Sequence, residues 1–67
     1  MKLFINGDSM ELPNSIRTVS ELLEHFQLDK KVVIVEKNKE ILQKDRHGSE
    51  SVQDGDQLEL VHFVGGG

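Results

Sequence analysis

The side chains that could do chemistry in this 67-residue sequence are few and widely spaced. There are three histidines and no cysteine, which excludes a disulfide framework, a cysteine zinc site and a thiol nucleophile. His25, His47 and His62 lack ligand spacing such as i, i+4 on a helix, whereas a metal site needs a converging set of ligands. We interpret them as surface or hydrogen-bonded histidines and predict no metal site.

Two carboxylates, Asp54 and Asp56, flank Gly55 and could form an acid–base pair or part of a calcium loop. The EF-hand pattern is absent, however, and Asp-Gly-Asp ahead of an alternating segment is ordinary turn chemistry. The serines lie outside any nucleophile motif. Because so short a chain also has little room for both a core and a deep pocket, we do not expect an enzyme.

The remaining candidate is the terminal run Gly65, Gly66 and Gly67. Glycines add nothing to a core, so a disordered end is the plain interpretation. A strand predicted up to Val64 would nevertheless give the tail a rigid base, and four residues reach about 13–14 Å into a partner's active site. The free carboxylate of Gly67 is unreactive until it is activated, for example by adenylation. A sulfur nucleophile could then convert it to a thiocarboxylate.

Composition describes a soluble globular chain, with 36% hydrophobic and 30% charged residues. The net charge of -4 disfavours nucleic acid, which needs clustered lysine and arginine, and favours a basic protein partner. Asp54, Asp56 and Glu59 could steer such a partner, although a solvated rim is as good an interpretation. No apolar run approaches the roughly 20 residues of a membrane span, and no signal peptide is visible, so we expect a cytoplasmic protein without membrane contact.

The elements that must position the tail follow from hydrophobic periodicity. Thr18 and Glu21 form a capping box, and an apolar stripe at helical spacing follows, which predicts one helix ending near Gln27. Alternation and turn signals predict a hairpin around Asn6-Gly7-Asp8 and a final strand after Asp56. Strands are thus expected over residues 2–6, 10–12, 31–36, 40–42 and 57–64, with loop or a single helical turn over 43–51.

This order predicts an α+β fold of the β-grasp (ubiquitin-like) class, a mixed sheet of four to five strands on one main helix. Residues 1–64 would form one domain, followed by a flexible tail over 65–67. We expect the apolar run 32–35 to be buried on both faces and Ile41 to point inward. If Leu3, Ile5, Leu58 and Leu60 of the first and last strands face the helix, the opposite face of the sheet carries apolar side chains. We expect a partner-facing surface there, made of Phe4, Val61, Phe63 and Val64.

Three motifs resemble the family of sulfur carrier proteins of thiamine biosynthesis, the ThiS family. Residues 18–24, Thr-Val-Ser-Glu-Leu-Leu-Glu, resemble its Thr-Val-x-Glu-Leu-Leu helix start. Residues 52–57, Val-Gln-Asp-Gly-Asp-Gln, resemble its Val-x-Asp-Gly-Asp turn, and Gly66-Gly67 matches its Gly-Gly end. The resemblance spans nearly the whole chain. Gly65 makes the tail one glycine longer than the family pattern.

The resemblance implies a carrier that is a co-substrate rather than a catalyst. An E1-like adenylyltransferase (ThiF type) would use ATP and Mg²⁺ to adenylate Gly67, and a cysteine desulfurase would supply the sulfur. Thiazole synthase (ThiG type) would then take the sulfur into the thiazole ring. Three alternatives stay open: the small subunit of molybdopterin synthase, a ubiquitin-like protein modifier, and a passive β-grasp binding module with an inert tail.

Overall fold

A computed structural model describes residues 1–62, which form a five-stranded sheet, one α-helix and one 3-10 turn. The elements are β1 (Lys2–Ile5), β2 (Asp8–Glu11), α1 (Val19–His25), β3 (Val33–Lys37), β4 (Glu40–Leu42), η1 (Lys44–Arg46) and β5 (Gln57–His62). The sheet order is β2-β1-β5-β3-β4, with β1 parallel to β5 and all other neighbours antiparallel. The predicted mixed sheet is confirmed, and its first and last strands lie parallel in the middle.

The β1–β2 hairpin turns over two residues, Asn6 and Gly7, which have φ values of 51° and 87°. Positive φ at both positions is typical of the tight turn whose twist matches that of paired strands. Pairing therefore resumes at Asp8, directly opposite Ile5. The predicted return strand over 10–12 began two residues too late, because the expected turn included Asp8.

Helix α1 begins at the predicted capping box. The backbone N–H of Glu21 donates to Thr18 Oγ1 at 3.2 Å, and the Thr18 N–H donates to Glu21 Oε1 at 3.1 Å. These bonds satisfy donors that the first turn of a helix leaves free. The helix ends at His25, and Gln27 turns the chain away with φ of 60°.

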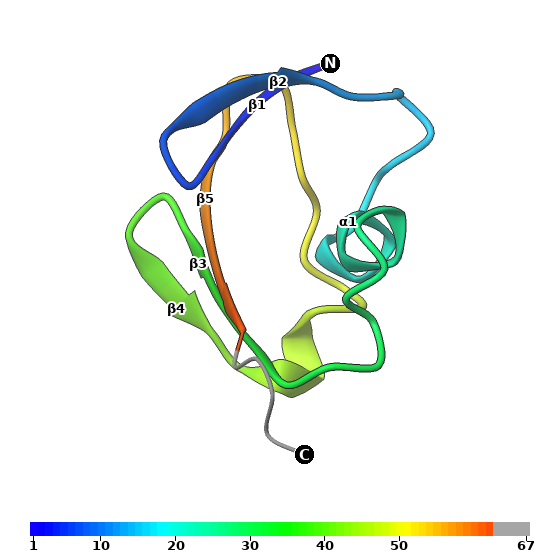
Figure 1. The fold of residues 1–67 in the computed structure, drawn as a ribbon, viewed down its shortest axis with the longest axis vertical. Coiled ribbons are helices and arrows are strands. Elements are labelled where there is room, and N and C mark those ends of the chain that lie inside the picture. Colours follow the sequence, from blue (N-terminus) through cyan, green and yellow to red (C-terminus); the bar gives the residue numbers. More distant parts are fainter. Residues whose placement is uncertain (63–67) are drawn as a thin grey trace.

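The sheet curves around α1, which covers one of its two faces (Figure 1). The core lies between them and is almost purely aliphatic. Its sheet side comes from β1, β3 and β5, and its other side comes from α1 and the connecting loops. The buried hydrophobic residues are Leu3, Ile5, Leu12, Ile16, Val19, Leu22, Leu23, Val35, Val52, Leu58 and Leu60. In residues 1–62 no helix is long and apolar enough to cross a membrane.

Two predictions about burial are wrong. In the apolar run 32–35 only Val35 is fully buried, while Val32 and Ile34 are 70% and 45% exposed. Ile41 was expected to point inward but is 67% exposed, and its neighbour Leu42 packs against the core instead. Ile34 and Ile41 share one reason: one short helix covers one face of the sheet, so alternate side chains of β3 and β4 remain on the other face. Val32 precedes β3 and is not part of the sheet.

Candidate functional site

The strand that precedes the glycine tail, β5, lies between β1 and β3 in the sheet. It pairs parallel with β1 at residues Phe4 and Ile5, and antiparallel with five consecutive residues of β3. Leu58 and Leu60 anchor it in the core with 1% and 7% exposure. The central position fixes the course of β5 up to His62.

Asn6 extends this support beyond the end of β1. Its side chain donates from Nδ2 to the Leu60 carbonyl oxygen at 3.1 Å and accepts from the Leu60 N–H at Oδ1 at 2.8 Å. Its own backbone N–H donates to the Leu58 carbonyl oxygen at 2.9 Å. The amide thus replaces a strand partner for the C-terminal half of β5. Sequence reasoning assigned Asn6 to the turn and missed this role, since only the parallel pairing brings Asn6 beside Leu60.

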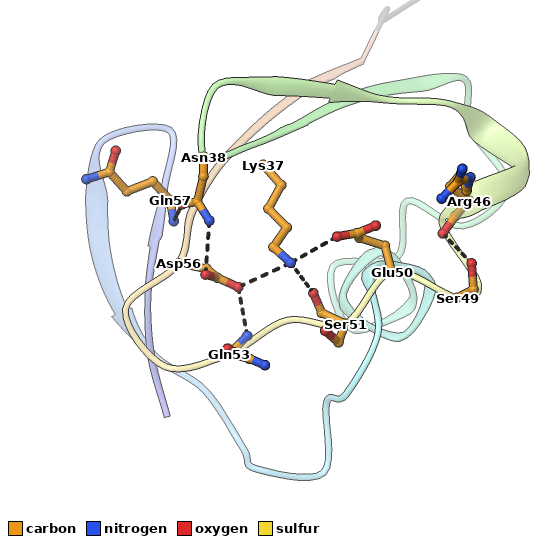
Figure 2. A network of polar contacts seen from close by, with 9 residues as sticks. All are labelled: Lys37, Asn38, Arg46, Ser49, Glu50, Ser51, Gln53, Asp56 and Gln57. Atoms are coloured by element: carbon orange, nitrogen blue, oxygen red, sulfur yellow. Dashed lines mark hydrogen bonds and ion pairs between the residues drawn. The ribbon is translucent and has the colours of Figure 1, made fainter.

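A polar network holds the loop before β5 against the β3–β4 hairpin (Figure 2). Lys37 Nζ donates to Glu50 Oε2 at 3.0 Å and to the Ser51 carbonyl oxygen at 2.7 Å, and lies 3.8 Å from Asp56 Oδ2. The Lys37 side chain is only 15% exposed, so these contacts compensate a largely buried ammonium group. The network sets the position at which β5 begins.

The Asp-Gly-Asp segment is a turn, as the sequence predicts. Asp54 Oδ1 accepts the Lys2 N–H at 2.6 Å, and the Gly55 N–H donates back to the Lys2 carbonyl oxygen at 2.7 Å. Asp56 accepts the Gln53 N–H at 2.8 Å through Oδ2. Both carboxylates therefore bind backbone groups, which is a structural task rather than acid–base chemistry.

The face of the sheet opposite α1, here called the open face, carries exposed apolar side chains. Val61 of β5 is 50% exposed and lies directly opposite Ile34 of β3, which is 45% exposed. Ile41 extends this cluster to the edge strand β4, opposite Glu36. Phe4 lies on the same face but is half-buried, beside Gln57 and under Lys2, whose Nζ is 5.4 Å from the ring centroid.

The predicted surface residues are thus only partly gathered. Phe4 and Val61 share the open face, but Gln57 and Glu59 separate them along β5. Sequence reasoning missed Ile34 and Ile41, which stand closer to Val61. The signal was present in the β-branched run: with one helix available, every second residue of that strand must face away from it. Phe63, Val64, Gly65, Gly66 and Gly67 lie outside the described residues.

The histidines do not come together. His25 is exposed and meets the Phe26 ring edge-on at a centroid distance of 5.2 Å, while His62 is half-buried at the end of β5. His47 is 7% exposed and its Nε2 atom has no hydrogen-bond partner, so the expectation of a surface or hydrogen-bonded residue is wrong there. Among residues 1–62, no group of three His, Cys, Asp or Glu side chains could hold a metal ion.

The described residues therefore present a candidate interaction surface. The central strand β5 lies between β1 and β3 and bears exposed apolar side chains on one face. In the sequence, the glycine tail follows shortly after it. Such an arrangement can dock a protein and present the chain that follows β5 to it.

Comparisons with known proteins agree with this description. The sequence matches the ThiS family over residues 3–67. It is 45% identical, over 97% of its length and 98% of the relative's, to the sulfur carrier protein ThiS of Bacillus subtilis (strain 168). It is also 45% identical over its whole length to 20% of a thiazole synthase from Paramagnetospirillum magneticum. A crystal structure of a thiamine biosynthesis protein (ThiS) from Geobacter metallireducens superimposes with a TM-score of 0.83 at 33% identity, over 100% of both chains.

Proposed function

Because the chain belongs to the ThiS family, and is a sulfur carrier of thiamine biosynthesis rather than an enzyme, we propose that Gly67 carries the sulfur as a thiocarboxylate. The observation that carries the proposal is the extent of the match, which runs through Gly67. The absence of cysteine supports it, since this chain has no thiol on which to hold a persulfide.

The proposed chemistry has an activation step and a sulfur step. A carboxylate oxygen of Gly67 attacks the α-phosphorus of ATP, which the adenylyltransferase holds with Mg²⁺, and pyrophosphate leaves. A persulfide sulfur supplied by a cysteine desulfurase attacks the acyl carbon, and AMP leaves. The attack forms a carbon–sulfur bond and gives an acyl disulfide. A second thiol then attacks the sulfur that belongs to the desulfurase-derived persulfide carrier, forms a disulfide with that carrier, and releases the thiocarboxylate of Gly67. In both reaction steps, every catalytic group belongs to a partner enzyme.

Thiazole synthase is the partner that the comparisons support. In the Paramagnetospirillum magneticum thiazole synthase, a fifth of the protein is similar to this whole chain. A carrier-like segment within the synthase polypeptide would keep donor and acceptor at a high effective concentration. We propose that the separate chain meets the same class of enzyme by binding, in the cytoplasm, where the adenylyltransferase and the desulfurase would also act.

We further propose that the open face contacts these enzymes. Val61, Ile34 and Ile41 supply exposed apolar area, and Phe4 extends the face toward β1. Phe63 and Val64 belong to the same proposal as the residues between β5 and the tail. In this proposal the partner binds β5, the strand that precedes the tail. Gly65, Gly66 and Gly67 would then enter the partner's active site in a fixed direction.

The test is the intact mass of the chain after incubation with a ThiF-type adenylyltransferase, ATP, Mg²⁺, a cysteine desulfurase, cysteine and a thiol reductant. We expect a mass increase equal to the exchange of one oxygen for sulfur, located at Gly67 by fragmentation. A chain lacking Gly67 is the matched control and should gain nothing. An unchanged mass of the intact chain in an otherwise active mixture would rule the proposal out.

A further inference from the structure

Resting on the proposed function, we infer that the thiazole synthase inserts an arginine side chain between Glu36 and Glu59, at the middle of the open face. The two glutamates stand directly opposite each other on the antiparallel strands β3 and β5. Directly opposite residues have Cβ atoms about 4.5–5.5 Å apart, and like charges at that position are destabilising. The isolated chain therefore carries a repulsion that a partner cation would relieve.

The part of the chain that the structure describes does not compensate this pair. Within residues 1–62, neither Glu36 nor Glu59 has an ion pair within 4.0 Å or a side-chain hydrogen bond. The neighbouring Lys37 points to the other side of the sheet, where Glu50 and the Ser51 carbonyl oxygen hold it. Lys39 lines the same hollow as the two glutamates but forms no ion pair with either.

The surroundings explain why a partner must supply the charge. Ile34 and Val61 form the next pair along the same two strands, and Ile41 stands opposite Glu36 on its other side. A protein that covers these apolar side chains also removes water from the two carboxylates. Because an unpaired buried charge is costly, docking here is favourable only if the partner places a cation between them.

The geometry favours arginine over lysine and over a metal ion. A guanidinium group is planar, presents several donors and is weakly hydrated, so it can bridge two carboxylates in an apolar setting. A metal site would need a third protein ligand, and within residues 1–62 no such group of three exists. The chain's net charge of -4 adds a general attraction to a basic surface.

The inference predicts opposite effects on binding and on stability. Glu36→Gln and Glu59→Gln should each weaken binding to thiazole synthase on the order of tenfold to a hundredfold, because the partner's arginine loses a charged acceptor. The same substitutions should leave the melting temperature of the free chain unchanged or raise it, because they remove the repulsion. Glu24→Gln, at an exposed carboxylate of α1, is the charge-matched control and should change neither.

Binding would be measured by calorimetry with a ThiG-type synthase, at low and at high salt. We expect the salt dependence to shrink in both glutamine variants and to persist in the control. Binding of both variants equal to that of the control would overturn the inference. A lower melting temperature in either variant would also overturn it, since the carboxylate would then be satisfied within the chain. Because the proposed function is tested separately by the mass gain at Gly67, a failure here leaves that result intact.

Discussion

The two faces of the sheet differ in composition and in what touches them. The face toward α1 is aliphatic and closed: Leu3, Val35 and Leu58 have at most 1% exposure. The open face alternates with it residue by residue along the same strands, yet mixes exposed Ile34 and Val61 with the carboxylates Glu36 and Glu59. Since the same backbone supports both, the difference lies in the side chains alone. It separates the residues that make the fold from those that are free to meet a partner.

The largest expected effect is a loss of stability from a substitution in the face toward α1. Leu58→Ala removes a side chain that is 1% exposed on the central strand, and should lower the free energy of unfolding by about 2–5 kcal/mol through lost burial and a residual cavity. Urea denaturation followed by circular dichroism measures the change. Leu58→Met, which nearly conserves volume, is the control and should cost less than about 1.5 kcal/mol. Equal, small losses for both variants would mean that the core does not depend on this position.

The next effect concerns the hydrogen bonds from Asn6 to the backbone of β5, the strand that contributes side chains to both faces. Asn6→Ala leaves the Leu60 N–H and carbonyl oxygen without the partners that the amide supplies, which should cost about 1–3 kcal/mol. The loss should be local, so hydrogen exchange at the Leu60 amide should accelerate more than at the amides of α1. Asn6→Asp keeps the acceptor Oδ1 and removes the donor. Its loss of stability should lie between zero and the loss caused by Asn6→Ala. Uniform acceleration across the chain would contradict a role confined to β5.

The smallest effect on the fold belongs to the open face. Val61→Asp should cost about 1 kcal/mol or less in stability, mainly through strand propensity. It should nevertheless weaken binding to the adenylyltransferase or to thiazole synthase by roughly tenfold or more, because it places a charge in the apolar cluster beside Ile34. Val32→Asp is the matched control: Val32 is also exposed, at 70%, but it precedes β3 and lines a pocket together with Leu23 and Glu24 of α1. Equal losses for both variants would remove the open face from the proposal.

The sequence predicted the covered half of the molecule well, because that half obeys local rules. Alternation placed Leu58 and Leu60 in the core, and the capping box placed the start of α1 at Thr18. The open face was harder to predict, since Ile34 and Ile41 have the residue types of a core and only the number of helices decides which face of the sheet is covered. Long-range contacts such as Asn6 with Leu60 depend on the register of two strands that are distant in the sequence. No local pattern encodes that register.

The candidate site also has a part that the sequence predicted and a part that it did not. Its proposed chemical end, Gly67, was predicted because terminal glycines add nothing to a core, and because the resemblance to sulfur carriers implies a function for them. Its surface was only half recognisable. Phe4 and Val61 follow from alternation, whereas the facing of Glu36 and Glu59 follows from pairing between β3 and β5, which becomes visible only in the folded chain.

The most direct test of the central claim follows the sulfur itself. The chain would be converted to its Gly67 thiocarboxylate with radiolabelled sulfur, purified, and mixed with thiazole synthase and the small-molecule substrates of that enzyme. The account predicts that the label leaves the protein for a small thiazole product, while the intact mass of the chain returns to that of the free carboxylate. Label that stays on the chain in the presence of active synthase would contradict it.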